Sequence, residues 1–292
     1  SKPGSLTIYT ENQSPGAFDG QLAGVMMVGD IYKKGRGRFD IKSSAWAWPA
    51  AGNNDILYKA ADTVFAGTLK LLSGSALSDS ANVVIMDTAN ATLDLNAQTE
   101  VIGSIAGGGT ITGTGGSLTL SSVTTKSSAA INTTFSGVLN GTFGLVKSVS
   151  GQTAGIDTLV LSRDNSSTYT GIVTVNYGIL KVSNDKALGS SATGNTVING
   201  GTVLIDSAGY TITEPFNIAG TGYSSNGAIR NLGKQTTLSG AITLGGAAII
   251  TSFGSNTVSS SKNSSCLSFG WPPRSWCLVF MRVVAVWGGV SG

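Results

Sequence analysis

Hydrophobic and polar residues alternate along much of the chain in short phrases that recur. Each phrase places an apolar residue at every second position, as in Gly-Thr-Leu-Lys-Leu at 67–71 and Ala-Thr-Leu-Asp-Leu at 91–95. Five more phrases of this kind begin at residues 116, 141, 157, 178 and 201, so that successive starts lie 16 to 25 residues apart. An alternation of period two is typical of a β-strand that buries one face. The pattern therefore predicts a series of short strands.

The segments between the phrases are rich in residues that favour turns. Glycine, asparagine, serine and aspartate cluster there, for example at 107–109, 165–167, 184–185 and 199–201. Such residues accept positive φ or cap the local backbone with their side chains. No window shows an apolar stripe with the helical period of about 3.6 residues, and Val, Ile and Thr dominate the phrases, which disfavours helix. We therefore predict an all-β protein.

A repeat of about twenty residues holds only two or three strands and cannot bury its apolar face alone. Because stacking of successive repeats closes the core, we predict a right-handed parallel β-helix, a solenoid in which each strand bonds to the strands one coil above and below. Its interior is expected to be a continuous column of Leu, Val and Ile, and its exterior to carry Thr, Ser, Asn and occasional charges. The alternative is an antiparallel sandwich or barrel, which also contains short strands at regular spacing.

Composition divides the chain into three segments. Residues 63–258 carry the repeated phrases and form the predicted solenoid. Residues 1–62 lack the phrase and contain Trp46 and Trp48, so we interpret them as a candidate cap that shields the first open coil. Residues 259–292 are rich in Trp, Cys, Pro and Arg, which fits an atypical tail that is disordered or arises from truncation. The first residue is Ser rather than Met, as expected of a processed or clipped piece.

The composition also excludes several kinds of chemistry and partner. The 292 residues include no His, which rules out histidine-activated nucleophiles and histidine-ligated zinc. Lys and Arg number 18 against 15 Asp and Glu, and the excess lies at Lys262, Arg274 and Arg282 in the tail, so no basic face is expected to bind nucleic acid. The longest apolar stretch, 276–290, is shorter than the roughly 20 residues of a membrane helix, so no membrane insertion is expected.

Carboxylates remain as candidates for catalysis, since some β-helices cleave glycans with two or three acids on one face. The candidates are Asp87, Asp94, Glu100, Asp157 and Asp164. Asp94 lies between Leu93 and Leu95 and is expected to point outward, and a step of 25 residues brings it to Thr119 rather than to another acid. We interpret each of the five as a solvated surface group. No Asp-rich nonapeptide or EF-hand spacing indicates calcium, and we predict no catalytic, metal-binding or cofactor-binding residue.

The basic cluster of the N-terminal segment comprises Lys33, Lys34, Arg36 and Arg38. Trp46 and Trp48 follow it, an arrangement that would suit an anionic polymer or a lipid headgroup. Because Asp30 and Asp40 flank the cluster, we interpret it as a charged, flexible loop.

Glycine clusters at 103–109 and 113–116 superficially resemble phosphate-binding loops. No Lys-Ser or Lys-Thr pair follows either of them, and no helix is predicted there, so we interpret both as turns. Cys266 and Cys277, in the tail, could close a disulfide in an oxidising compartment.

One part of the chain resembles a known family. Its phrases are Phe-Ser-Gly-Val-Leu-Asn-Gly at 135–141, Gly-Leu-Val-Lys at 144–147, Leu-Val-Leu-Ser at 159–162, Thr-Tyr-Thr-Gly at 168–171 and Thr-Val-Asn-Tyr-Gly-Ile-Leu at 174–180. They are similar to the autotransporter-associated β-strand repeat, and the likeness extends over about 64–250. Tyr177 departs from that pattern, which has a small or polar residue at this position. The resemblance implies a passenger region that is displayed on a bacterial cell surface or secreted across the outer membrane, and it brings no catalytic residues.

We therefore expect a non-enzymatic, surface-exposed stalk or adhesin. Its outer Thr, Ser and Asn side chains would make weak, multivalent contacts with glycans or other cell surfaces. A carbohydrate-active β-helix enzyme is one alternative, and it requires a groove with at least two carboxylates within about 10 Å. A viral or filament-forming fibre is another, in which terminal coils associate end to end.

Overall fold

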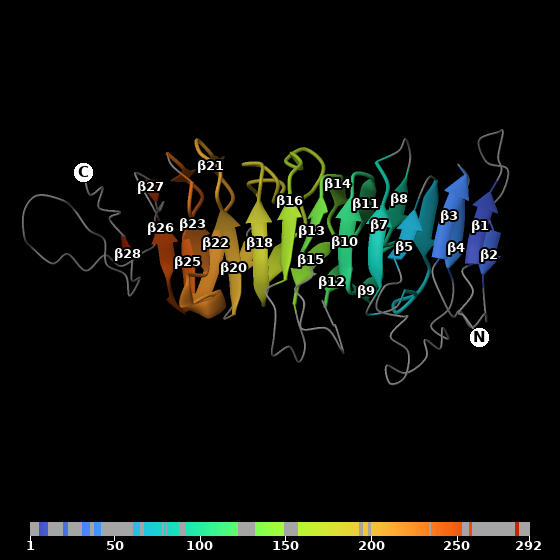
Figure 1. The fold of residues 1–292 in the computed structure, drawn as a ribbon, viewed down its shortest axis with the longest axis horizontal. Coiled ribbons are helices and arrows are strands. Elements are labelled where there is room, and N and C mark those ends of the chain that lie inside the picture. The colour runs from blue at the N-terminus through green and yellow to red at the C-terminus, as the bar shows by residue number, and fades with distance from the viewer. Residues whose placement is uncertain are drawn as a thin grey trace, which may run out of the picture.

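The computed structural model describes residues 67–252, apart from 78, 80, 88–90, 122–131, 149–156, 193–194, 198–199 and 234. Beyond that range it describes the backbone of short strands at 6–10, 20–22, 31–35, 38–41, 61–64, 257–258 and 284–285. The strands are stacked side by side along the long axis of the molecule, from β1 at one end to β28 at the other (Figure 1).

The strands of the described residues form four sheets. The first has twelve strands: β1 (Leu6–Thr10), β3 (Ile31–Gly35), β5 (Ala61–Val64), β7 (Asn82–Ile85), β10 (Ser104–Gly107), β13 (Asn132–Phe135), β16 (Thr158–Leu161), β18 (Gly178–Val182), β20 (Gly201–Ile205), β23 (Ile229–Asn231), β26 (Ile250–Ser252) and β28 (Val284–Ala285). The second has six: β2 (Gly20–Leu22), β4 (Arg38–Ile41), β6 (Thr68–Leu71), β8 (Thr92–Asp94), β11 (Thr110–Gly113) and β14 (Val138–Gly141). The third has seven: β9 (Thr99–Ile102), β12 (Ser117–Leu120), β15 (Gly144–Lys147), β17 (Val173–Val175), β19 (Asn195–Val197), β22 (Phe216–Gly220) and β25 (Ile242–Ala248). The fourth has three: β21 (Thr211–Ile212), β24 (Thr237–Leu238) and β27 (Thr257–Val258).

Every strand pairing in the described part of the chain is parallel. Consecutive strands lie in different sheets, and each strand pairs with the strand one coil away. For example, β10, β11 and β12 make one coil, and β13, β14 and β15 make the next. A parallel pair cannot be joined by a tight hairpin, so the chain must travel around the coil before it returns to the same sheet. The predicted parallel β-helix is confirmed, and the antiparallel alternative is wrong.

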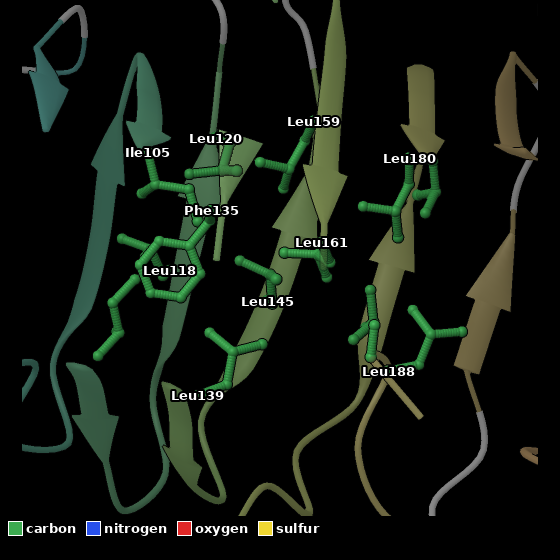
Figure 2. Close-up of a cluster of buried hydrophobic side chains, with 14 of the residues drawn as sticks. Ile105, Leu118, Leu120, Phe135, Leu139, Leu145, Leu159, Leu161, Leu180 and Leu188 are labelled. Carbon is green, nitrogen blue, oxygen red and sulfur yellow. The ribbon is translucent and has the colours of Figure 1, made fainter. Parts of the chain in front are cut away.

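The interior is a continuous column of apolar side chains that runs from Leu69 to Ile250. Leu118 lies opposite Leu145 in the next coil, and Leu159 lies opposite Leu180. All four are buried, and they converge from different sheets on the axis of the coil (Figure 2). The predicted inward column is therefore present, and aromatic residues join it at Phe135, Phe143 and Tyr169.

The repeated phrases do not mark one position of the coil. Those at 67–71 and 91–95 fall in the second sheet, the phrase at 116–120 falls in the third, and the phrases at 157–161, 178–182 and 201–205 fall in the first. The in-register partner of Leu93 in the next coil is Ile111, not Leu118. Every sheet of the coil buries one face, so strands of every sheet need the same alternation of apolar and polar residues. Similar phrases can therefore occur in different sheets.

Strands from the N-terminal segment join the same sheets as the repeat region. β1, β3 and β5 extend the first sheet, while β2 and β4 extend the second. β28 pairs with β26 near the other end. The division into a cap at 1–62, a repeat region at 63–258 and a tail at 259–292 stays a prediction.

Among the described residues, one face of the solenoid carries no strand over two coils. The second sheet ends at β14 and the fourth begins at β21, so the described segments 162–172 and 183–192 lie between them. Tyr169 makes a single parallel bridge to Gly141 here. Its ring is buried, as are the side chains of Ala187 and Leu188. Side chains rather than strands therefore close the core on this face.

Gly137→Ala is expected to lower the free energy of unfolding by about 1–3 kcal/mol. Gly137 lies in the turn between β13 and β14, where an added Cβ would lie 1.9 Å from the carbonyl oxygen of Gly109 and 2.6 Å from Cζ of Phe135. Backbone must move to relieve that clash. Gly144→Ala is the matched control, because its Cβ would meet nothing closer than Cβ of Ser117 at 3.5 Å. Chemical denaturation of both variants tests this, and equal losses would contradict it.

Candidate functional surface

The outer face of the third sheet is uncharged. Its strands place one column of residues in register: Val101, Thr119, Val146, Thr174, Thr196, Asn217 and Thr243. The charged residues within these strands are Glu100 and Lys147, and both are buried. Apart from Thr196, whose side chain lies outside the described residues, this column therefore forms a neutral surface of β-branched and amide side chains.

The outer face of the second sheet carries paired polar groups. Lys70, Asp94, Thr112 and Asn140 occupy one column in register. The amine of Lys70 lies 4.0 Å from a carboxylate oxygen of Asp94, and the amide of Asn140 donates a hydrogen bond of 3.1 Å to the Thr112 hydroxyl. Asp94 therefore points outward as predicted. Its in-register neighbour is Thr112, however, and the predicted step to Thr119 is wrong because the coil is shorter here.

Of the other four candidate carboxylates, two are exposed and two are buried. Asp87 and Asp164 are exposed, in agreement with the surface interpretation. Glu100 and Asp157 are buried, and for these two the surface interpretation is wrong. The alternation contained the signal: Glu100 shares its side of the strand with the buried Ile102, and Asp157 shares its side with the buried Leu159.

Glu100 caps a turn from inside the solenoid. Its side chain starts from an inward position on β9, opposite Leu118. Its two carboxylate oxygens accept hydrogen bonds of 2.9 and 2.8 Å from the backbone N–H groups of Ala76 and Leu77. Burial raises the pKa of this carboxyl to about 7, and the nearby Asp79 adds to the rise, whereas the backbone hydrogen bonds oppose it. Both carboxylate oxygens are thus engaged in hydrogen bonds that stabilise the fold.

Lys147 and Glu214 are buried charged residues that sequence reasoning missed. Burial lowers the pKa of the Lys147 amine to about 8, and the carboxylate of Asp157 opposes this change. Lys147 lies on the same side of β15 as the buried Leu145, so the alternation along the strand predicts that its side chain points inward. Glu214 accepts a hydrogen bond of 3.1 Å from the backbone N–H of Thr213. Burial raises the pKa of Glu214 to about 6, with smaller contributions from Asp185 and Asp164.

The basic cluster lies partly in strands. Lys33 and Lys34 belong to β3, and Arg38 belongs to β4, so the loop interpretation is wrong for these three residues. The two strands belong to different sheets. Each contains apolar residues, such as Ile31 and Phe39, that fit the alternating pattern of a strand. Arg36, Trp46 and Trp48 lie outside the described residues, as do Cys266 and Cys277.

In the two glycine clusters, Gly107 and Gly113 are the last residues of β10 and β11, so the turn interpretation is wrong for these two, whereas the other glycines lie in turns, as predicted. Gly107 has φ of 102°, and a Cβ there would lie 1.9 Å from the carbonyl oxygen of Ile85. Gly116 also has positive φ. Across the described ranges, no group of three or more Asp, Glu, Cys or His residues is arranged to hold a metal ion, and no helix is long and apolar enough to cross a membrane.

The chain is similar in sequence to a known protein. In an alignment 218 residues long that covers 71% of this chain, the sequence is 28% identical to the adhesin BmaC autotransporter of Brucella suis biovar 1 (strain 1330). The chain spans 6% of the length of that relative. No family model and no solved structure matches the chain. The similarity covers most of the chain, and it fits a passenger-like region built as a β-solenoid.

Proposed function

We propose that the chain is a non-enzymatic part of an autotransporter-type passenger, displayed at the bacterial surface or secreted, and that it serves as a stalk or an adhesive surface. The observation that carries the proposal is the parallel solenoid, with outer columns of the second and third sheets in which Thr and Asn recur, in a chain similar to an autotransporter adhesin. The phrases at 135–182 support an assignment to the autotransporter-associated β-strand repeat.

The architecture suits a stalk because each coil is bonded to its neighbours along the whole axis. Parallel ladders satisfy the backbone groups between coils, and the inward column removes apolar surface from water continuously. Side chains add further bonds between coils. The Asn165 amide accepts a hydrogen bond from the N–H of Leu139 (2.9 Å) in one coil and donates to the carbonyl of Ala187 (3.0 Å) in another.

An adhesive role follows from repetition. Outward Thr and Asn side chains recur in several coils of the second and third sheets, and neighbouring coils lie about 4.8 Å apart, so a long ligand can contact several similar positions. Each contact is weak, and affinity grows with their number. We propose glycans or other cell surfaces as the partners of these faces, with no role in nucleic-acid binding or membrane insertion.

A carbohydrate-active enzyme is less well supported, because the relevant carboxylates are already engaged. Glu100 binds two backbone N–H groups, and Asp94 lies beside Lys70. Release of new reducing ends or unsaturated sugars from a polysaccharide substrate would contradict the non-enzymatic proposal. Filaments that lengthen with protein concentration would instead favour the fibre alternative and association through terminal coils.

Display at high density is expected to raise retention of the chain on glycan-coated surfaces by about 10²–10⁴-fold over the single copy. The chain is biotinylated at one terminus and coupled to streptavidin beads at graded density, and bead retention on glycan-bearing cell layers is compared with binding of the soluble chain. Beads blocked with biotin alone are the control. Retention that does not change with density would contradict an adhesive role based on repetition, and no retention at any density would leave only the stalk.

A further inference from the structure

Two partly exposed tyrosines meet on one corner of the solenoid. Tyr177 lies between β17 and β18, and Tyr223 lies between β22 and β23, where it begins the short 3₁₀ turn η2 (Tyr223–Ser225), the coiled ribbon at the edge of the sheets in Figure 1. Both positions connect the third sheet to the first. Their ring centroids are 6.3 Å apart, and the ring planes are nearly perpendicular, at 85°. Neither tyrosine belongs to the buried core.

The coil between them leaves room for this contact. Gly200 occupies the same corner, between β19 and β20. A Cβ on Gly200 would lie 3.4 Å from Cδ2 of Tyr177, and the residue has φ of 95°. Glycine at this corner therefore allows the ring of Tyr177 to lie along the surface and reach the following coil. Tyr177 is also the position at which the chain departs from the repeat family, which has a small or polar residue there.

The loop that carries Tyr223 is held in a fixed shape. The hydroxyl of Thr202 accepts a hydrogen bond of 2.8 Å from the N–H of Tyr223 and donates one of 2.8 Å to the carbonyl of Gly227. Thr202 is only 2% exposed. Ser224 and Ser225 both have positive φ, 50° and 59°, a conformation that few residues other than glycine adopt. Strained, over-determined backbone of this kind is concentrated at ligand-binding sites.

Two lysines near Tyr177 are either buried or paired with a carboxylate. The side-chain oxygen of Asn176, next to Tyr177, is buried and has no hydrogen-bond partner. The adjoining outer face of the third sheet is neutral, as described above. The amine of Lys147 lies beneath Gly178 but is buried, and Lys181, the charged residue nearest to Tyr177 in sequence, is paired with Asp206 at 2.7 Å.

We propose that Tyr177 and Tyr223 form a stacking site for the ring of a neutral sugar. An aromatic face offers a negative π-surface to the C–H groups on the apolar side of a pyranose, and the perpendicular second ring closes one side of the platform. Because Lys147 is buried and Lys181 is paired with Asp206, the site favours a neutral glycan over an acidic polymer or a nucleic acid. This inference rests on the proposed adhesive function and assigns it a specific position.

Affinity electrophoresis of the full chain through gels that contain laminarin, galactomannan or dextran tests the proposal, with heparin as the acidic probe. Wild type is expected to be retarded by at least one neutral polysaccharide, and Tyr177→Ser and Tyr223→Ser to weaken this binding about tenfold or more, the effect of losing roughly 1.4 kcal/mol. Tyr177→Phe keeps the ring and is expected to bind as wild type. Ile172→Ser, at an exposed apolar residue away from the two tyrosines, is the matched control.

Several outcomes would overturn the site. These are retardation by heparin alone, no retardation by any neutral polysaccharide, and equal retardation of wild type and both serine variants. In the last case the adhesive function would stand and only its assignment to the tyrosines would fail, whereas the bead assay decides the adhesive function separately. Thermal unfolding of each variant identifies any loss of binding that arises from misfolding, and Tyr177→Phe then decides whether the ring is required.

Discussion

Tyr169→Ala is expected to lower the free energy of unfolding by about 3–5 kcal/mol, as deletion of a large buried aromatic side chain does. The Tyr169 ring is fully buried and packs against Phe143, with 5.1 Å between ring centroids. It fills the solenoid where the second sheet has ended and the fourth has not begun. Backbone hydrogen bonds hold this segment to the coils on both sides, from the N–H of Thr170 to the carbonyl of Gly141 (2.9 Å) and from the N–H of Ser190 to the carbonyl of Tyr169 (2.8 Å), so neighbouring backbone cannot easily collapse into the space. The cavity is therefore expected to persist and to carry its full energetic cost.

Urea denaturation of the purified chain measures this effect, and Tyr169→Phe separates its two causes. The Tyr169 hydroxyl donates a hydrogen bond of 2.8 Å to the carbonyl oxygen of Phe143. Phenylalanine keeps the ring and loses only this bond, so about 1 kcal/mol is expected. If alanine and phenylalanine lowered the stability equally, the hydrogen bond rather than the packed ring would be the important contribution. Hydrogen exchange at Gly141 and Thr170, whose N–H groups bond across these coils, would show whether the loss stays local.

The interior of the solenoid was predictable from the sequence because one physical rule governs it. Alternation placed Leu118 and Leu120 on the buried side, and the same rule holds for Leu159 and Leu161. Register was not predictable in this way. Each sheet repeats the same alternation, so two similar phrases need not lie in the same sheet, and the length of each coil depends on its loops. This is why Leu93 lies opposite Ile111.

For the buried charged residues, the strand alternation pointed to the correct inward position, but the general rarity of buried charges was given more weight. Charged residues are seldom buried, and that tendency assigned Glu100 to the surface although its strand position points inward. Burial becomes acceptable only when hydrogen bonds replace water, and here the N–H groups of Ala76 and Leu77 supply them. These groups belong to a turn of the preceding coil, more than 20 residues away in sequence. Local reasoning had no access to that contact.

The tyrosine corner depends on the same kind of distant information. Tyr177 was notable in the sequence only as a departure from the repeat pattern. Its contact with Tyr223 spans three stacked coils, and Gly200 lies in the middle one, next to the Tyr177 ring. This stacking cannot be derived from the residues adjoining Tyr177. A solenoid thus turns positions that are far apart in sequence into one surface, and a single substitution on the corner can create a contact that no linear motif records.

Glu100→Gln is expected to remove most of the pH dependence of stability between pH 5 and 8. The pKa of Glu100 rises from 4.5 in the unfolded chain to about 7 in the folded one. Between these values the folded state binds more protons, so the stability that Glu100 contributes is complete below pH 4.5 and is lost as pH rises through 7. The shift corresponds to roughly 3 kcal/mol at about 1.4 kcal/mol per pKa unit. Wild type is therefore expected to be more stable at pH 5 than at pH 8.

Other titrations can be separated from this one. The pKa of Glu214 rises to about 6, so its titration also lowers stability as pH rises, but at lower pH than that of Glu100. The pKa of Lys147 falls to about 8, so its titration makes stability rise with pH, and only above that value. Glu100→Gln should thus leave the smaller slope of Glu214, and the exposed Asp87→Asn should keep the full wild-type slope. Urea denaturation at pH 5 and pH 8 compares the three proteins. An unchanged slope in Glu100→Gln would mean that the carboxyl titrates at its ordinary pKa, and the turn at 76–77 would then not be held by a desolvated carboxylate.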